Sequence, residues 1–169
     1  MFEKVNPGHP DKVADRIAGA IVDLAYKENN NPKIAVEVLI GHGKCHIIVE
    51  TDTEIKPYDI YDIVDRRTEQ HVVTTIMKVP QDENLAANQE NEIRCGDNGI
   101  FKGTRVTYEQ QVLTDLSGEL YNRWTCDGKY FVDYETSKRL VICQSNADAQ
   151  QIKDYILSAW GYKYTGEII

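Results

Sequence analysis

Two pairs of neighbouring strand segments restrict this chain to a small group of folds. Residues 33–40 (KIAVEVLI) and 44–50 (KCHIIVE) flank a Gly-His-Gly turn, which predicts a β-hairpin of two mostly buried strands. Residues 129–135 (KYFVDYE) and 138–145 (KRLVICQS) predict a second hairpin in the same way. Each pair therefore predicts antiparallel strands joined by a short turn.

Helical periodicity separates these hairpins. Apolar residues recur three or four positions apart, as Val13, Ile17, Ile21 and Leu24 do. The predicted helices cover about 11–26, 57–70, 107–123 and 147–160. One further strand is predicted over 71–79, and hairpin followed by helix occurs twice, over 34–70 and 129–160. This alternation predicts an α+β fold, with mainly antiparallel sheet and helices packed on one face.

Composition and charge narrow the class of protein. The 169 residues are 41% hydrophobic and 27% charged, which is typical of a globular chain. The net charge is −8 and no basic stripe exists, so nucleic acid is not expected as a partner. The apolar runs are too short to cross a bilayer, so no membrane partner is expected. Four scattered cysteines and the lack of a signal-like start predict a cytoplasmic protein with free thiols.

Ionisable residues gather in the turn before the first helix. Pro10 fixes its own φ and favours an extended His9, so the imidazole projects from a rigid turn. Asp11 lies in the first helical turn, where it either caps the helix or offers an oxygen to a hard cation such as Mg²⁺. The residues alone favour the cap, because Asp is common at helix starts.

Two acidic residues lie in the first hairpin. Glu37 stands in the middle of IAVEVLI, where it either faces solvent or is held by a cation or by donors. The apolar residues on both faces of the strand favour a buried carboxylate. Glu50 ends the partner strand, where it lies either close to Glu37 or in solvent.

The segment from 80 to 105 lacks periodicity and is rich in turn residues. Loops of this length and composition are typically functional or irregular. Within it, CGDNGIFKG (95–103) predicts a tight turn at Asp97-Asn98, and the Lys and Arg side chains around it suit a phosphate group. Taken alone, the motif favours a plain turn.

Taken together and in order, these segments resemble the S-adenosylmethionine synthetase family. VNPGHPDKVADRIAGAIVDLA (5–25) is similar to the amino-terminal signature of that family, with Pro7 in place of its usual acidic residue. IAVEVLI and IIVET resemble the next two strands, NQEN resembles the segment beside the active-site loop, and CGDNGIFKG resembles a GDQG-type turn. The resemblance is strong to about Gly103 and weaker beyond it. There TSKRLV (136–141) matches an Asp-x-Lys strand, with Thr in place of Asp.

This resemblance implies a methionine adenosyltransferase. In that reaction the methionine sulfur attacks C5′ of ATP and displaces triphosphate, which is hydrolysed to phosphate and pyrophosphate. The resemblance also implies Mg²⁺ and K⁺ as cofactors, and a homodimer or higher oligomer with its site at a subunit interface. The implied roles are catalysis for His9 and Lys138, ATP contacts for Glu3, His9 and Lys138, methionine contacts for Glu50, Gln89 and Asp97, and metal binding for Asp11 (Mg²⁺) and Glu37 (K⁺).

The resemblance also divides the chain. It implies an N-terminal-domain-like region over 1–105 and a central-domain-like region over 106–169, together in one compact unit. Family members add a third domain that brings further charged residues to the triphosphate. The apolar tail over 161–169 is expected either to add a strand to a neighbouring subunit or to fray.

Three hypotheses follow from this division. The chain is a compact methionine adenosyltransferase, or a non-catalytic relative that binds nucleotide, methionine or S-adenosylmethionine, or one subunit of a split synthetase completed by a second polypeptide. The presence of His9 together with the implied ligand acids favours the first.

Overall fold

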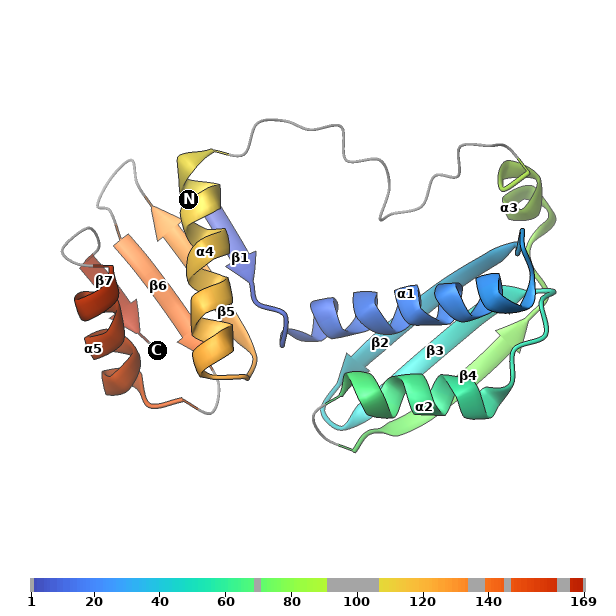
Figure 1. Ribbon diagram of the computed structural model, residues 1–169, viewed down its shortest axis with the longest axis horizontal. Helices are drawn as coiled ribbons and strands as arrows, with labels where there is room; N and C mark the ends of the chain where they lie inside the picture. The colour runs from blue at the N-terminus through green and yellow to red at the C-terminus, as the bar shows by residue number, and fades with distance from the viewer. Residues whose placement is uncertain are drawn as a thin grey trace. The chain divides into compact units, whose positions relative to one another are not determined.

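The chain folds into two compact units (Figure 1). This computed structural model describes residues 2–68, 71–90, 107–133, 139–144, 147–160 and 165–168. One unit comprises residues 1–12 and 103–169, and the other comprises residues 13–102. We call them the terminal unit and the middle unit.

The sheet of the middle unit has the strand order β2-β3-β4. β2 (Ile34–Gly41) and β3 (Lys44–Thr51) form the predicted antiparallel hairpin. Its turn residues His42 and Gly43 both have positive φ, 48° and 74°, as the favoured two-residue hairpin turns require. β4 (Val73–Val79) then pairs parallel with β3, after a connection that contains a helix.

Two helices cover one face of this sheet. α1 (Pro10–Glu28) and α2 (Pro57–Arg67) lie across the strands in Figure 1. Side chains along β3 point alternately to the two faces of the sheet. Cys45, Ile47 and Val49 are buried against the helices, whereas the residues between them face the other way. Buried side chains of both helices complete this core, namely Ile17, Ile21, Ala25, Ile60 and Val64.

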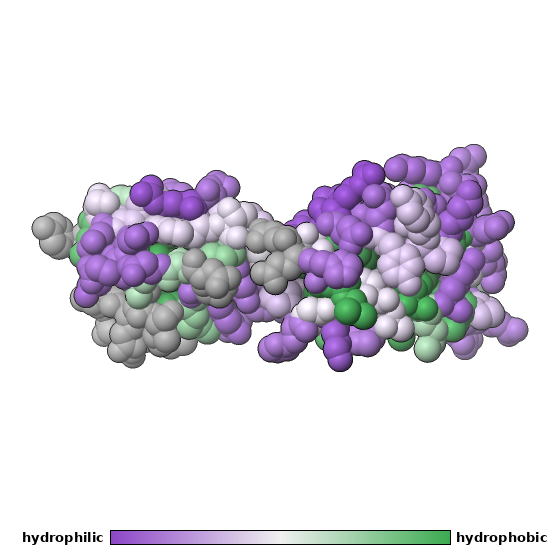
Figure 2. Space-filling model, turned by 90° about the horizontal axis from the view of Figure 1, so that it is seen from below, coloured by the Kyte–Doolittle hydropathy of each residue, from purple (hydrophilic) through white to green (hydrophobic). Residues whose placement is uncertain are grey.

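The other face of the sheet is exposed, and we call it the exposed sheet face. Leu39 is 71% exposed, Ile48 41%, Val73 65% and Met77 57%. The strand register places these side chains on one surface, together with Glu37 and Glu50. Green hydrophobic side chains interrupt the mostly purple surface of the middle unit in Figure 2.

The terminal unit repeats the element order of the middle one. β5 (Gly128–Asp133) and β6 (Arg139–Gln144) are antiparallel, and β7 (Thr165–Ile168) follows α5 (Ala149–Ala159) and pairs parallel with β6. α4 (Tyr108–Arg123) precedes this hairpin as α1 precedes the first, and a capping box of Thr107 and Gln110 starts it. β1 (Phe2–Val5) adds an antiparallel strand beside β5. The core is formed chiefly by Leu113, Leu116, Leu120, Tyr130, Val132, Leu140, Ile142 and Ile152.

The α+β fold and both hairpins are confirmed, with three differences. β1 was missed because four residues are too short for a clear alternation. A short helix, α3 (Glu83–Asn88), lies within the predicted loop. The tail was expected to join a neighbouring subunit or to fray, whereas Thr165–Ile168 pairs with β6 of the same chain.

The bounds of the two units differ from those of the expected regions, and the expectation that these regions share one compact unit stays a prediction. Residues 1–12 belong with the C-terminal region, because β1 pairs with β5 and not with the first hairpin. Each unit has its own cluster of buried apolar residues. The assignment of 1–105 and 106–169 to two family domains stays a prediction.

Candidate functional site

The turn between β1 and α1 holds His9 in a defined position. The backbone N–H of Asn6 donates to the carbonyl of Gly128 at 2.9 Å, and the N–H of His9 donates to the carbonyl of Asn6 at 3.1 Å. Pro10 then occupies the first position of the helix, where its missing N–H costs nothing. The His9 side chain is 20% exposed.

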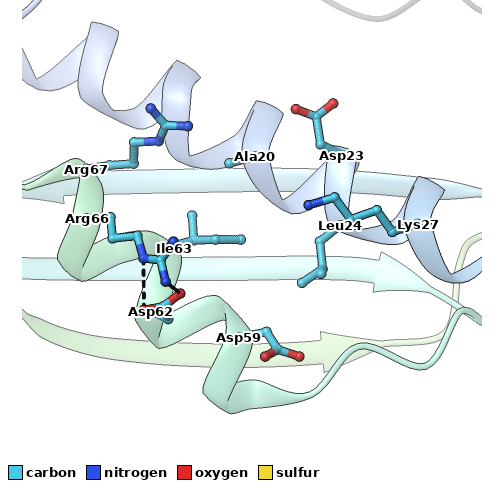
Figure 3. A pocket seen from close by; sticks show the side chains of 9 residues that line it. All are labelled: Ala20, Asp23, Leu24, Lys27, Asp59, Asp62, Ile63, Arg66 and Arg67. Atoms are coloured by element: carbon cyan, nitrogen blue, oxygen red, sulfur yellow. Dashed lines mark hydrogen bonds and ion pairs between the residues drawn. The ribbon is translucent and has the colours of Figure 1, made fainter.

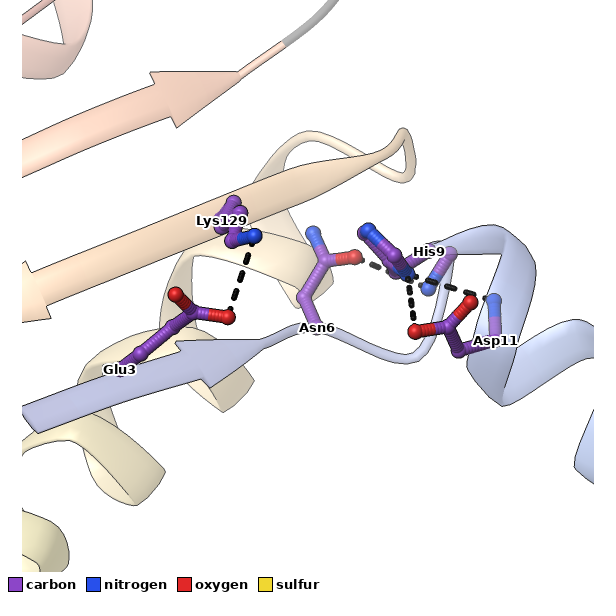
Figure 4. A network of polar contacts seen from close by, with 6 residues as sticks. Glu3, Asn6, His9, Asp11 and Lys129 are labelled. Atoms are coloured by element: carbon purple, nitrogen blue, oxygen red, sulfur yellow. Dashed lines mark hydrogen bonds and ion pairs between the residues drawn. The ribbon is translucent and has the colours of Figure 1, made fainter.

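His9 itself caps the first helix. Its Nδ1 accepts the backbone N–H of Asp11 at 3.2 Å (Figure 4). Because Nδ1 presents its lone pair to that donor, the proton of the neutral imidazole lies on Nε2. The turn therefore leaves one N–H donor on His9, the Nε2–H.

Asp11 does not take the capping role that the residues alone favoured. Its backbone N–H is bonded to His9, and its Oδ2 lies 3.7 Å from His9 Nδ1. The carboxylate is 80% exposed, so its oxygens remain available to a cation. An exposed carboxylate at a helix start suits Mg²⁺, which takes one or two such ligands and completes its shell with water and phosphate oxygens.

Glu3 lies on β1 in the same unit. Its Oε1 is 3.1 Å from Nζ of Lys129 on β5, with both side chains about half exposed (Figure 4). Lys129 is a cation that the sequence pattern did not single out. Its place next to Glu3 follows from the β1–β5 register, in which Val5 pairs with Lys129.

The expectation that Glu37 is buried is wrong. Its side chain is exposed on the exposed sheet face of the middle unit, between Ala35 and Leu39 along β2. Both helices pack on the other face, so an apolar sequence on either side of Glu37 does not bury it. Glu50 is half-buried and lies on the same face, because it pairs with Ala35.

Gln89 is held against the start of β2. Its amide Oε1 accepts the N–H of Ile34 at 3.0 Å, and its Nε2 donates to the carbonyl of Ile34 at 3.0 Å. Gln81 Nε2 also donates to Gln89 Oε1, at 2.8 Å. Since Glu50 pairs with Ala35, Gln89 and Glu50 lie at the same end of the sheet. The Oε1 of Gln81 is buried there with no hydrogen-bond partner among the described residues.

Asp97 and Lys138 lie outside the described residues, as do the basic residues around the 95–103 motif. Their roles stay predictions. Within the terminal unit, Glu3, His9 and Asp11 lie on β1, in the turn after it and in the first turn of α1. Within the middle unit, Glu37 and Glu50 lie on the sheet, and Gln89 is bonded to its first strand.

In the described part of the chain, no group of three or more His, Cys, Asp or Glu side chains could hold a metal ion. A separate pocket of about 430 Å³ lies between α1 and α2, with Asp23, Lys27, Asp62 and Arg67 among its lining residues (Figure 3). None of the predicted site residues lines it.

No helix among the described residues is long and apolar enough to span a membrane.

Comparison with known proteins finds relatives of part of the chain. The family model described as S-adenosylmethionine synthetase, N-terminal domain, matches residues 1–93. The S-adenosylmethionine synthase of Salinispora tropica is 44% identical over 66 residues, which are 39% of this chain and 16% of that protein. That of Helicobacter pylori is 40% identical over 53 residues, which are 31% of this chain and 14% of that protein.

A solved structure shares the fold of nearly the whole chain. It is described as an unusual S-adenosylmethionine synthetase from Campylobacter jejuni, and the likeness covers 98% of this chain with a TM-score of 0.65 and 17% sequence identity. The chain spans 56% of that structure, and the aligned segments span about one sixth of the curated relatives.

Proposed function

This chain belongs to the S-adenosylmethionine synthetase family, and we propose that it forms S-adenosylmethionine from ATP and methionine as a homodimer or higher oligomer. The observation that carries the proposal is the turn at His9 and Asp11. It places an Nε2–H donor next to an exposed carboxylate, at the start of a helix whose first residue is Pro10.

In the proposed reaction, the main task of the protein is to stabilise negative charge on the leaving group. Displacement of triphosphate places several negative charges on the leaving group, and preorganised donors are the strongest means of stabilising them. His9 donates its Nε2–H to an oxygen of that group as the C5′–O bond breaks. Glu3 and Lys138 contact the nucleotide, and Glu50, Gln89 and Asp97 contact methionine.

Two metal ions belong to this proposal. Asp11 fits Mg²⁺ as one oxygen ligand, and the ion when bound would neutralise part of the charge on the triphosphate. Glu37 is assigned to K⁺. A single exposed carboxylate suits this ion only where a second surface encloses it, so the assignment depends on the assembly.

The exposed sheet face supports that assembly. Leu39, Ile48, Val73 and Met77 expose apolar surface on one side of β2-β3-β4, and apolar patches of this kind mark interaction sites. We assign a second copy of the chain to this face. Glu37 and Glu50 would then lie in the interface, where a partner could complete their surroundings.

The proposal also includes a cytoplasmic location. Among the described residues, Cys45, Cys126 and Cys143 carry free thiols, which suits a reducing compartment.

A second candidate function is binding without turnover, or turnover only with a second polypeptide. It is favoured by the exposure of both proposed metal ligands, because the carboxylates of Asp11 and Glu37 need further groups around them before they neutralise the charge of the reaction.

The decisive experiment incubates the purified chain with ATP, methionine, Mg²⁺ and K⁺ and measures the sulfonium product by mass spectrometry. Turnover by the pure protein supports the synthetase. Turnover only after a second chain is added selects a split enzyme. Tight binding of ATP or methionine by calorimetry without product selects the binding relative.

A further inference from the structure

A buried polar network lies directly behind the His9 turn. Asn6 and Tyr130 are 0% exposed, and Gln144 is 9% exposed. Asn6 Nδ2 donates to the Tyr130 hydroxyl at 3.0 Å, and that hydroxyl donates to Gln144 Oε1 at 2.7 Å. Three side chains from β5, β6 and the chain after β1 are therefore joined inside the terminal unit.

Both ends of this network are tied to the backbone. Asn6 Nδ2 also donates to the carbonyl of Cys126 at 2.7 Å, and Gln144 Nε2 donates to the carbonyl of Trp124 at 3.0 Å. Asn6 Oδ1 accepts the N–H of Gly8 at 3.0 Å. The turn that carries His9 is thus bonded to the segment leading into β5. Figure 4 shows Asn6 and His9 in this turn.

Two glycines show how closely the turn approaches this segment. A Cβ at Gly128 would collide with the Tyr130 hydroxyl and lie 2.6 Å from Asn6 Nδ2. A Cβ at Gly8 would lie 2.9 Å from the Cys126 carbonyl oxygen and 3.1 Å from the Tyr121 ring. Neither position has room for a side chain, so the turn and the network are closely packed against each other.

Apolar side chains would fill this space at lower cost if packing were the only requirement. A buried polar group loses its hydration, and it stabilises the fold only when its partners are well placed. What a fully bonded network adds is one defined geometry. Burial also raises the pKa of Tyr130 to about 12.

We propose that Asn6, Tyr130 and Gln144 are positioning residues, which set the place of the His9 imidazole through the bonds of Asn6 to Gly8 and His9. None of the three was singled out by the sequence patterns. This inference rests on the proposed function of His9. A displacement of about 1 Å at a group that meets developing charge can cost on the order of 10²-fold in rate, which is the scale of effect such residues control.

The test substitutes Tyr130→Phe, which removes only the hydroxyl, and uses Tyr155→Phe as the matched control. The Tyr155 hydroxyl donates to Glu119 at 3.1 Å in the same unit, so its removal leaves the bonds among Asn6, Tyr130 and Gln144 in place. Tyr130→Phe should lower kcat by about tenfold or more while KM for methionine changes less than about twofold. Tyr155→Phe should leave kcat within about twofold.

A second measurement does not depend on turnover. Hydrogen exchange of the Gly8 and His9 amides should become roughly tenfold faster in Tyr130→Phe, and the NMR signals of the His9 imidazole should shift or broaden. Gln144→Met, which removes the acceptor for the tyrosine hydroxyl, should give the same changes and serves if Tyr130→Phe does not fold.

The outcomes separate the two proposals. If the wild-type chain makes no product, the proposed function fails, and the exchange data still test the network. If both network variants leave the amides and the His9 signals as in the wild type, the positioning role is overturned, whatever the turnover. A loss of kcat equal in Tyr130→Phe and Tyr155→Phe would also overturn it.

Discussion

At the scale of single residues, His9 is the side chain with the best-defined chemistry. Its Nδ1 is used by the Asp11 amide, so the neutral ring keeps its proton on Nε2. The Asp11 carboxylate does not cap the helix as was expected, and it is exposed. This hydrogen bond uses the His9 Nδ1 and the Asp11 amide, and it leaves the Asp11 carboxylate without a capping bond to make.

His9→Ala should remove most turnover and leave the fold intact. Loss of one preorganised donor to developing charge costs roughly 10²–10³ in kcat. Loss of the helix cap should cost only about 1 kcal/mol of stability. The two effects are measured by product formation and by urea denaturation. His71→Ala, an exposed histidine before β4, is the control, and full activity of His9→Ala would refute the assignment.

Glu37→Gln should weaken the dependence of turnover on K⁺. Replacement of the carboxylate by a neutral amide, which keeps one oxygen but removes the charge, should raise the K⁺ concentration for half-maximal activity by about tenfold. The measurement is a K⁺ titration of product formation, with Glu54→Gln, another exposed acid of the middle unit, for comparison. An identical K⁺ response in both variants would count against the site.

Tyr130 should make the terminal unit sensitive to alkali. Burial raises the pKa of its hydroxyl from 10.0 to about 12, so the folded state holds the proton more tightly than the unfolded chain does. The stability that the protonated hydroxyl gives to the folded state is fully present below about pH 10 and is lost as pH rises toward 12. Circular dichroism across this range should show less loss of stability in Tyr130→Phe than in the wild type.

At the scale of elements, turns set the register of the hairpins. β2 and β3 are joined by His42 and Gly43, both with positive φ, so Gly41 pairs with Lys44 and every later pair follows. A slip by one residue would turn Cys45, Ile47 and Val49 away from the helices. The turn thus decides which residues of β3 enter the core.

Gly43→Ala should destabilise the middle unit by about 1 kcal/mol, because L side chains are strained at a φ of 74°. Gly41→Ala is the matched control, since its added Cβ meets no atom within 4 Å and its φ is not positive. Urea denaturation followed by circular dichroism measures both. Equal stability of the two variants would show that the turn tolerates a side chain.

At the scale of the whole molecule, two units repeat one order of elements. α1-β2-β3-α2-β4 and α4-β5-β6-α5-β7 each contain an antiparallel hairpin, a helix and a parallel third strand. In the middle unit this arrangement buries one face of the sheet under the helices and leaves the other exposed with its apolar residues.

Leu39→Lys should therefore shift the chain toward a monomer. A lysine on the exposed sheet face would lose its hydration if that face is covered on association, which costs several kcal/mol. Sedimentation velocity measures the change. Tyr58→Lys, at a side chain 76% exposed on α2, is the control, and a wild-type chain that is already monomeric would refute the assembly.

Local patterns in the chain were sufficient for the fold class, both hairpins, the longer helices and the family resemblance, because periodicity, turn residues and motifs are properties of neighbouring residues. They were insufficient for Glu37, whose burial depends on where α1 and α2 pack. They also missed the Asn6–Tyr130–Gln144 network, whose members lie up to 138 positions apart in sequence. Only tertiary structure decides such features, since the direction a strand faces and the partner a buried polar group finds depend on distant parts of the chain.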